Sequence, residues 1–430
     1  MKKVFVLLLS IALLVSMLGA CGSKPAETAD VGGTSAPESE EKPLEGHIVV
    51  GTNRTNIADT LLTDFAEKFM EKHPGCTVEF EGINDLEQTM MTRMTADEMP
   101  DVSILLYTKL TPDDYSQYFL PLDDLGFTSD DFYFYENGLG TDGHLYQIIP
   151  DMYTNCVFYN KAAFEKAGIE KAPTTMEELE EACEKLKAVG ITPFGTSFRD
   201  LWPLRGWFSG FYSQIGFTGN RNFMSDLVKS DTLLDDTEYG NKYFLDIARD
   251  FAQKGYLDPD LPNANWDDLR RDIISEKIAM FYDGAWYGPL LVYDAGLPAE
   301  NCGAFPFPGA KNLTICPSWG NGVAKNTEYP ELAKAFLKEM VTSKEYADIC
   351  KAEVTSKHYQ LDLPGVEELY SYNLPVIEMP NMDPELIEIF NEAQINPDEL
   401  AQEYILSENP DEVVAKYNQK WKEAKAALGK

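Results

Sequence analysis

Basic residues are scarce in this sequence relative to acidic ones. The 430 residues include 36 lysines and arginines against 71 aspartates and glutamates, which gives a formal net charge of −35. Nucleic acids and anionic membrane surfaces are bound through basic patches, so this balance argues against either of them as a partner.

Motifs for catalysis and for metal binding are also missing. There is no Walker A pattern, no G-x-S-x-G nucleophile elbow and no zinc-ligand spacing among the four histidines. Gly138-x-Gly140-x-x-Gly143 matches the dinucleotide fingerprint, but it precedes a strand-like run rather than a helix. We therefore predict a turn there, and we expect no cofactor, no metal site and no enzymatic activity.

Cysteine is sparse and irregularly spaced, with no C-x-x-C motif. Several cysteines lie in apolar runs, where a free thiol packs as a small hydrophobic group. An exported protein can hold disulfides, and Cys302 with Cys316 could close a loop. We predict mostly buried thiols, and the pairing stays open among Cys76, Cys156, Cys183, Cys302, Cys316 and Cys350.

The one long apolar run lies at the N-terminus. Residues 4–17 follow two lysines and have the length of a signal-peptide core rather than of a spanning helix. The run ends in Leu-Gly-Ala-Cys21, which resembles a bacterial lipobox and implies cleavage before Cys21 and lipidation of that cysteine. An ordinary signal peptide with an incidental cysteine is the alternative interpretation.

The N-terminal region therefore divides into two parts. We predict a lipoprotein signal peptide over residues 1–20, to be left out of the fold. Residues 21–45 are rich in Pro, Gly, Ser, Thr and Glu without an apolar period, which is typical of a flexible tether. This organisation predicts a protein anchored through Cys21 on the extracellular face of a bacterial cell membrane.

Strands and helices alternate after the tether. The segments 47–51, 77–80 and 100–106 predict strands, and amphipathic segments between them predict helices. This order is typical of a parallel sheet with helices on its faces. Ligands of such sheets bind beyond the carboxyl ends of the strands, which directs attention to the loops that carry Asn53 and Tyr107.

Residues 143–194 have the most regular local pattern. They predict strands at 145–149 and 156–159, a helix capped by Asn160, and a second helix that begins with the capping box Thr175-x-x-Glu178. The predicted buried face of the second helix consists of Leu179, Ala182, Leu186 and Val189.

Several tryptophans stand beside glycine or proline in predicted loops. Flat apolar rings suit the C–H faces of pyranose sugars, and neighbouring Asp, Asn and Arg side chains can hydrogen-bond the hydroxyls. Core packing is the alternative for any one ring, but we expect two or more of the group to contact a ligand. The group is Trp202, Trp207, Trp286 and Trp319.

Taken together, the chain resembles the family 1 extracellular solute-binding proteins, the carbohydrate-binding lipoproteins of ABC importers, a group that includes maltose-binding protein. The resemblance covers nearly all of residues 46–425. Its motifs are Tyr146-x-x-x-Pro150, Val157-Phe-Tyr159-Asn160-Lys161-x-x-Phe164-x-x-Ala167-Gly168, Pro173-x-Thr175-x-x-Glu178-Leu179, Pro100-Asp101-Val102, Ala279-Met-x-x-Asp283-Gly-x-Trp286 and Gly320-x-Gly322-x-Ala324.

The resemblance implies an α/β fold of two lobes like that of periplasmic binding proteins. Each lobe would be a mainly parallel sheet flanked by helices, with the ligand cleft between the lobes. The first lobe would comprise residues 46–151 and 308–352, and the second residues 152–307 and 353–430, including C-terminal helices. Such proteins close around the solute by a hinge motion and then dock on a permease.

The resemblance also implies a set of ligand-binding residues. Trp286 matches the family's stacking aromatic, and Tyr153 falls where relatives often place an acid that bonds the sugar. Trp202 resembles a second-lobe aromatic segment, and the match is weakest after residue 352. The expected set is Trp286, Tyr153, Trp202, Asp283, Asn53, Arg54, Tyr107 and Trp319.

These observations predict a lipid-anchored receptor that captures a sugar or oligosaccharide and delivers it to an ABC permease without chemistry of its own. One alternative is a surface-anchored glycosidase, because the separation of two catalytic carboxyls in space does not follow from one sequence. Another is a receptor for a non-sugar solute such as a peptide or a polyamine, since a charge of −35 suits a cationic ligand.

Overall fold

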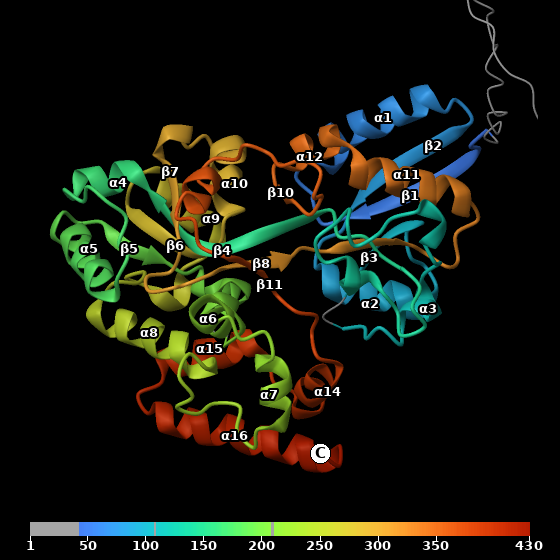
Figure 1. The fold of residues 1–430 in the computed structure, drawn as a ribbon. Coiled ribbons are helices and arrows are strands. Elements are labelled where there is room, and N and C mark those ends of the chain that lie inside the picture. Colours follow the sequence, from blue (N-terminus) through green and yellow to red (C-terminus); the bar gives the residue numbers. More distant parts are fainter. Residues whose placement is uncertain (1–42, 107–108, 208–209) are drawn as a thin grey trace, which may run out of the picture. The chain divides into compact units, whose positions relative to one another are not determined.

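The computed structural model describes residues 43–106, 109–207 and 210–430. Within residues 43–430 there are two sheets, each with helices packed against it (Figure 1). The first has the order β2-β1-β3-β9. Its strands are β1 (Gly46–Thr52), β2 (Cys76–Gly82), β3 (Val102–Leu105) and β9 (Gly320–Val323). β1 pairs in parallel with β2 and with β3, as the alternation of elements predicts, and β9 is added antiparallel to β3.

The helices of the first sheet come from two separate stretches of the chain, residues 58–118 and residues 330–350. They are η1 (Ala58–Leu62), α1 (Thr63–Lys72), α2 (Leu86–Ala96), the short α3 (Tyr115–Tyr118), α11 (Pro330–Thr342) and α12 (Lys344–Cys350). α1 and α11 meet through aromatic side chains: the ring centroids of Phe69 and Phe336 lie 4.9 Å apart, edge to face. Segments far apart in the sequence thus share one hydrophobic core.

The second sheet has the order β11-β8-β4-β6-β5, and β7 and β10 also pair with β4. Its strands are β4 (Asp151–Asn160), β5 (Thr192–Gly195), β6 (Ile278–Gly284), β7 (Cys302–Phe305), β8 (Leu313–Pro317), β10 (Glu353–Val354) and β11 (Val376–Glu378). Only the pairs β5–β6 and β8–β11 are parallel. β4 runs antiparallel to β6, β7, β8 and β10.

The expectation of a mainly parallel sheet is therefore wrong for this second sheet. That expectation came from the family resemblance, whereas the βαβ order that favours parallel strands is found in the sequence only up to residue 106. Here long connections intervene between neighbouring strands, so a strand can return to β4 from the opposite direction, and alternation along the sequence does not settle its orientation.

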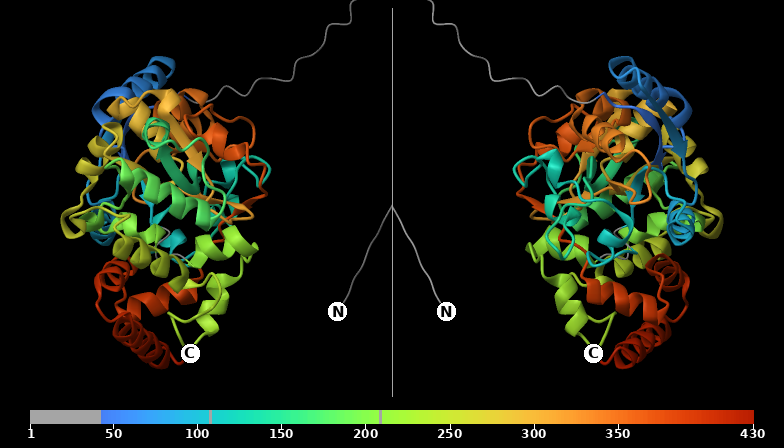
Figure 2. Two further views of the ribbon diagram at one scale, coloured as in Figure 1. Left: turned by 90° about the vertical axis from the view of Figure 1, so that its left-hand side faces the viewer. Right: turned by 90° about the vertical axis from the view of Figure 1, so that its right-hand side faces the viewer.

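The remaining helices surround the second sheet or follow it. They are α4 (Lys161–Lys166), α5 (Met176–Ala188), α6 (Gly210–Ser213), α7 (Phe223–Lys229), α8 (Asn241–Lys254), α9 (Trp266–Ile274), α10 (Tyr287–Ala295), α13 (Val366–Tyr370), α14 (Pro384–Ala393), α15 (Pro397–Leu406) and α16 (Pro410–Ala427). Figures 1 and 2 show α14, α15 and α16 gathered at one end of the described body, where α14 packs against α7 and α15 against α8.

Local signals for helix ends are confirmed. The Asn160 side chain accepts a hydrogen bond of 2.9 Å from the backbone N–H of Ala162, and Thr175 with Glu178 forms the predicted capping box. Leu179, Ala182 and Leu186 are buried as expected. Val189 is not: it follows the last residue of α5 and is 44% exposed.

Two predictions about residues 143–194 fare differently. The strand predicted at 156–159 is confirmed as the second half of β4. The strand predicted at 145–149 is wrong. Leu145 and Ile148 make only isolated bridges, to Leu139 and Asn321, because each faces a different segment and no continuous partner lies alongside.

The cysteines among the described residues are free, and all but Cys350 are buried, which confirms the prediction of mostly buried thiols. Cys350 alone among them is partly exposed, and Cys302 and Cys316 form no disulfide. The predicted lipidation site Cys21, the predicted signal peptide and almost all of the predicted tether lie outside the described residues.

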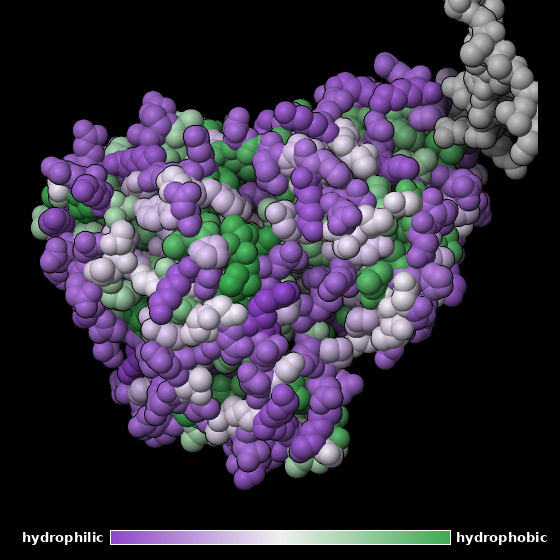
Figure 3. Space-filling model, viewed as in Figure 1, coloured by the Kyte–Doolittle hydropathy of each residue, from purple (hydrophilic) through white to green (hydrophobic). Residues whose placement is uncertain are grey.

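The surface seen in Figure 3 is mostly hydrophilic, with apolar residues gathered near its middle. Within residues 43–106, 109–207 and 210–430, no helix combines the length and the apolar character needed to cross a membrane.

Candidate ligand-binding groove

A groove of about 580 Å³ lies between the segment after β1 and helix α10, with α12 beside it. Its volume falls within the ~300–1,000 Å³ typical of small-molecule sites. It brings together Arg54 and Trp286, the two predicted ligand residues that lie in its walls. The full lining is Arg54, Asn56, Ile57, Leu61, Trp286, Pro289, Leu290, Tyr293, Asp294, Lys344, Glu345, Asp348, Ile349, Cys350, Lys351 and Ala352.

An ion pair anchors the first side of the groove. Nη2 of Arg54 lies 2.7 Å from Oδ2 of Asp151, with the side chains 32% and 17% exposed. Burial is the largest influence and disfavours the charge on Arg54, but the attraction of Asp151, the hydrogen bond to it and the nearby Cys350 and Tyr346 together outweigh burial, so the pKa of the guanidinium lies above its ordinary value. Because Arg54 follows β1 and Asp151 begins β4, the pair ties the first sheet to the strand that enters the second.

A smaller cavity lies behind this ion pair. It has a volume of about 30 Å³, enough for a water molecule, and Asn53 and Trp319 line it together with Arg54 and Asp151. Both of these predicted residues thus lie beside Arg54, on the first-sheet side of the groove. Tyr107, the remaining first-lobe residue of the predicted set, lies outside the described residues.

Three residues of the predicted set, Tyr153, Asp283 and Trp202, adjoin Trp286 on the second-sheet side of the groove. Gly284 ends β6 and lies between Trp286 and Tyr153: a Cβ added there would lie 2.5 Å from Cδ1 of Trp286 and 2.6 Å from Cδ2 of Tyr153. Only glycine lets the two rings approach this closely. The hydroxyl of Tyr153 lies 3.0 Å from that of Tyr212, so the tyrosine at the position of the usual family acid is held by a hydrogen bond.

Asp283 is the titratable group of this cluster. Burial raises its pKa to about 7, while the positive charge of Arg205 and a hydrogen bond from Trp286 act in the opposite direction. Arg205 itself is bound in a fork by Asp398 of α15, with Nε–Oδ1 and Nη2–Oδ2 distances of 3.3 and 3.1 Å. Asp283 therefore changes protonation near neutral pH and is able to donate or to accept a hydrogen bond.

Trp286 belongs to a cluster of three tryptophans. The ring centroids of Trp202 and Trp266 lie 5.0 Å apart, and the Trp286 ring lies 6.0 Å from Trp202 and 5.7 Å from Trp266. Trp202 stays 40% exposed. The cluster presents an aromatic surface beside the groove.

Sequence reasoning missed Trp266, because it assigned that residue to a helix and weighed only tryptophans in loops. The available signal was the cap: Asn265 Oδ1 accepts from the backbone N–H of Asp268 at 3.1 Å, which makes Trp266 the first residue of α9. A side chain at a helix end is free to join a loop cluster. Trp207, by contrast, is buried in the core, with its ring 5.1 Å from that of Tyr282.

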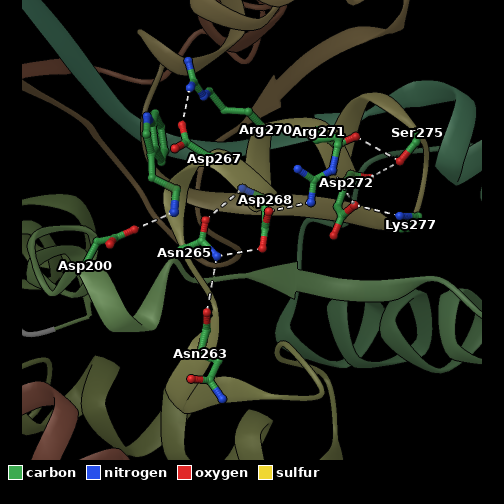
Figure 4. A network of polar contacts seen from close by, with 11 residues as sticks. Asp200, Asn263, Asn265, Asp267, Asp268, Arg270, Arg271, Asp272, Ser275 and Lys277 are labelled. Carbon is green, nitrogen blue, oxygen red and sulfur yellow. Dashed lines mark hydrogen bonds and ion pairs between the residues drawn. The ribbon is translucent and has the colours of Figure 1, made fainter.

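A network of polar contacts runs from Asp200 to the start of α9 and along this helix (Figure 4). Oδ2 of Asp200 accepts a 2.5 Å hydrogen bond from the backbone N–H of Trp266. Asp200 ends the short helical turn η4 (Phe198–Asp200), and Trp202 begins the next turn, η5 (Trp202–Gly206). Leu201 between them has φ 63°, a conformation that costs about 1–3 kcal/mol and must be held by its surroundings. The carboxylate thus fixes the Trp202 loop beside α9.

The part of the chain that the structure describes contains no group of three or more His, Cys, Asp or Glu side chains placed to hold a metal ion. The chemistry of the groove is that of aromatic faces next to charged, planar hydrogen-bonding groups.

Comparison with known proteins places this geometry in context. The model of the family described as bacterial extracellular solute-binding proteins matches residues 53–347. A multiple sugar-binding protein of Streptococcus mutans is 22% identical over 368 residues, which cover 81% of this chain and 84% of that protein.

Two solved structures show the same fold. A manno-oligosaccharide-specific solute-binding protein of Bifidobacterium animalis subsp. lactis, in complex with mannotriose, aligns with a TM-score of 0.77 at 20% identity, covering 89% of this chain and 95% of that one. The solute-binding protein RafE in complex with raffinose aligns with a TM-score of 0.71 at 18% identity, covering 88% and 100%. The two-lobed α/β fold expected from the sequence is thereby confirmed, with the correction to the second sheet given above.

Proposed function

This chain belongs to the bacterial extracellular solute-binding proteins, and we propose that it captures a sugar or oligosaccharide and delivers it to the permease of an ABC transporter. The family consists of binding proteins that act outside the cytoplasm, so the chain is a receptor and not an enzyme. The alternative of a surface-anchored glycosidase is not retained.

The observation that carries the proposal is the meeting of Trp286 and Arg54 in one groove. An indole face supports the C–H face of a pyranose, and the Arg54–Asp151 pair offers donors and acceptors close together for vicinal hydroxyls. Asp283, Tyr153 and Trp202 adjoin Trp286 and supply further polar and aromatic contacts. We assign ligand binding to this set together with Asn53, Trp319 and Tyr107.

Capture involves a hinge motion of two lobes in this proposal. We assign residues 46–151 and 308–352 to the first lobe and residues 152–307 and 353–430 to the second, with one change. β8 lies in the range given to the first lobe but pairs with β4 of the second sheet, so the second lobe takes in β8 up to Pro317.

Anchoring rests on the N-terminal sequence alone. We propose that residues 1–20 are removed, that Cys21 carries the lipid, and that residues 21–45 form the tether that leads to β1. Cys21→Ala should release the protein from the cell surface into the medium, and mass spectrometry of the mature N-terminus should find the lipid on Cys21. An unmodified cysteine at a cleaved N-terminus would show an ordinary signal peptide instead.

Binding is tested by a thermal-shift screen of mono- and oligosaccharides followed by calorimetry. A ligand that binds the native state raises the melting temperature by mass action. We expect Trp286→Ala to lower the affinity at least tenfold, Val189→Ala on the exposed end of α5 to leave it unchanged, and the ligand to be recovered unaltered. A screen in which peptides or polyamines bind and no carbohydrate does would replace the sugar with a non-sugar solute.

A further inference from the structure

The part of the groove beyond Trp286 has apolar walls. Ile57 and Leu61 stand on the side of the first sheet, and Pro289, Leu290 and Tyr293 stand on the side of α10. Leu61 is 45% exposed and Tyr293 is 47% exposed, which places both among the most exposed large apolar side chains of the described residues. Apolar surface left open inside a groove is typical of a binding site.

Most polar groups around these walls are engaged with other protein groups. Nδ2 of Asn56 lies 3.3 Å from Oδ2 of Asp294, across the groove. Nζ of Lys351 stands 5.1 Å from the centroid of the Tyr293 ring. Glu345 is ion-paired with Lys68 of α1. Lys344 and Asp348 are exposed at the rim. The surface left for an occupant to cover is therefore largely apolar.

This chemistry differs from that beside Arg54. There, charged planar groups stand next to an indole, which suits a ring that carries hydroxyls. Branched aliphatic side chains such as Ile57 and Leu61 have no flat face for a pyranose and offer its hydroxyls no hydrogen bond. Lys351 covers one face of the Tyr293 ring, so a sugar there would lose hydration with little compensation. An alkyl or aryl group would gain by leaving water.

We propose that the ligand is a glycoside whose sugar lies beside Arg54 and Trp286 and whose apolar aglycone, an aryl or alkyl group, lies between Leu61 and Tyr293. The two sites are continuous, since all four residues line one groove. This inference rests on the proposed sugar-binding function and names the class of ligand that would fill the whole groove.

The test compares matched probes. Calorimetry measures the affinity of the full chain for methyl and phenyl glycosides of glucose, galactose, mannose and xylose in both anomeric forms. For the sugar that binds, we expect the phenyl glycoside to bind roughly tenfold more tightly than the methyl glycoside, the scale expected for burying much of one ring. Equal affinities would overturn the inference, as would a trisaccharide that gains tenfold when the phenyl group does not.

Variants locate the effect. In Leu61→Ser with Tyr293→Ser, we expect the phenyl advantage to fall to twofold or less while the methyl glycoside binds as before. Both side chains are about half exposed, so the fold should survive, and a thermal melt checks this. Val376→Ser with Leu406→Ser, at 44% and 49% exposure outside the groove, should keep the advantage.

Two further outcomes would contradict either the place given to the aglycone or the proposed sugar-binding function. A phenyl advantage that persists in the groove variant would place the aglycone elsewhere and overturn the inference, while the sugar receptor would stand. If neither glycosides nor oligosaccharides bind at all, the proposed function itself fails. The two failures are therefore distinguishable.

Discussion

The two sides of the groove are built in different ways. On the first-sheet side, Arg54 stands in a loop and is held by one ion pair to Asp151. On the second side, Trp286 is fixed by two tryptophan neighbours, by the close approach of Tyr153 over Gly284 and by a hydrogen bond to Asp283. The aromatic side is thus a packed platform, whereas the polar side depends on a single contact that a small movement could change.

The difference suggests a division of labour. Packed aromatic rings lose little side-chain entropy when a ligand arrives, because the protein has already ordered them. A loop arginine retains more freedom and is suited to adjusting to the ligand. Each of the following substitutions disrupts one side of the groove.

Gly284→Val should have the largest effect, because it strikes the platform itself. A Cβ at this position meets Trp286 and Tyr153 at 2.5 and 2.6 Å, so both rings must move. We expect a loss of about 1–3 kcal/mol in the free energy of unfolding, typical of overpacking, measured by urea denaturation. We also expect carbohydrate affinity to fall by more than tenfold in calorimetry.

Gly216→Val is the matched control for that substitution. Its added Cβ would have ordinary contacts, the nearest being Thr314 Oγ1 at 3.9 Å. If Gly284→Val bound ligand like the wild type, the platform would not depend on this close approach.

Trp266→Ala should weaken the packing that holds Trp202 and Trp286. The indole is partly buried against Trp202 and Trp286, so its removal should cost about 2 kcal/mol of stability, less than the ~3–5 kcal/mol of a fully buried ring. Trp266→Phe should recover part of this loss. Tryptophan fluorescence follows the change at Trp202 and Trp286 against the signal of the other three tryptophans. An unchanged affinity would show that Trp266 does not support the site.

Arg54→Gln should have a smaller effect on stability and a clear one on binding. The pair with Asp151 is partly exposed, so we expect about 1 kcal/mol or less in urea unfolding, with the affinity reduced several-fold. Asp151→Asn and the double variant complete a cycle that measures the coupling of the pair. Additive losses of affinity would show that the two residues act independently.

The pH dependence of Asp283 should be the most gradual effect. Burial raises its pKa in the folded state to about 7, above the ~3.9 of an unfolded aspartate. The folded state therefore holds the proton more tightly, and Asp283 lowers the stability progressively as the pH rises from about 4 to 7.

Asp283→Asn removes this titration and should be more stable than the wild type at pH 8, with the advantage disappearing toward pH 4. Urea denaturation at several pH values measures it. Asp59→Asn, on the exposed face of η1, is the matched control. An advantage that is constant with pH would exclude titration of Asp283 as the cause.

Much of the local structure follows from short segments of the sequence. The cap of Asn160, the capping box of Thr175 and Glu178, and the parallel pairing of β1 with β2 and β3 involve neighbours within a few residues or one βαβ unit. Each of these signals lies in the same short segment whose structure it sets. The family resemblance adds the two-lobed fold, which the comparisons confirm.

Other features depend on what comes alongside from elsewhere in the chain. Residues 145–149 have strand composition but no continuous partner, and Val189 continues the helical period but falls past the end of α5. Trp207 and Trp202 stand five residues apart in one segment, yet one is buried in the core and the other is exposed. Composition alone does not separate such cases.

By itself, the sequence determined the helix caps, the parallel pairing of β1 with β2 and β3, and the residue types that suit a sugar, because these depend on local geometry and on chemical character. Only the tertiary structure decided the antiparallel neighbours of β4, the place of Trp266 among the tryptophans and the meeting of Arg54 with Trp286. These depend on long connections, which bring distant segments together only when the whole core packs.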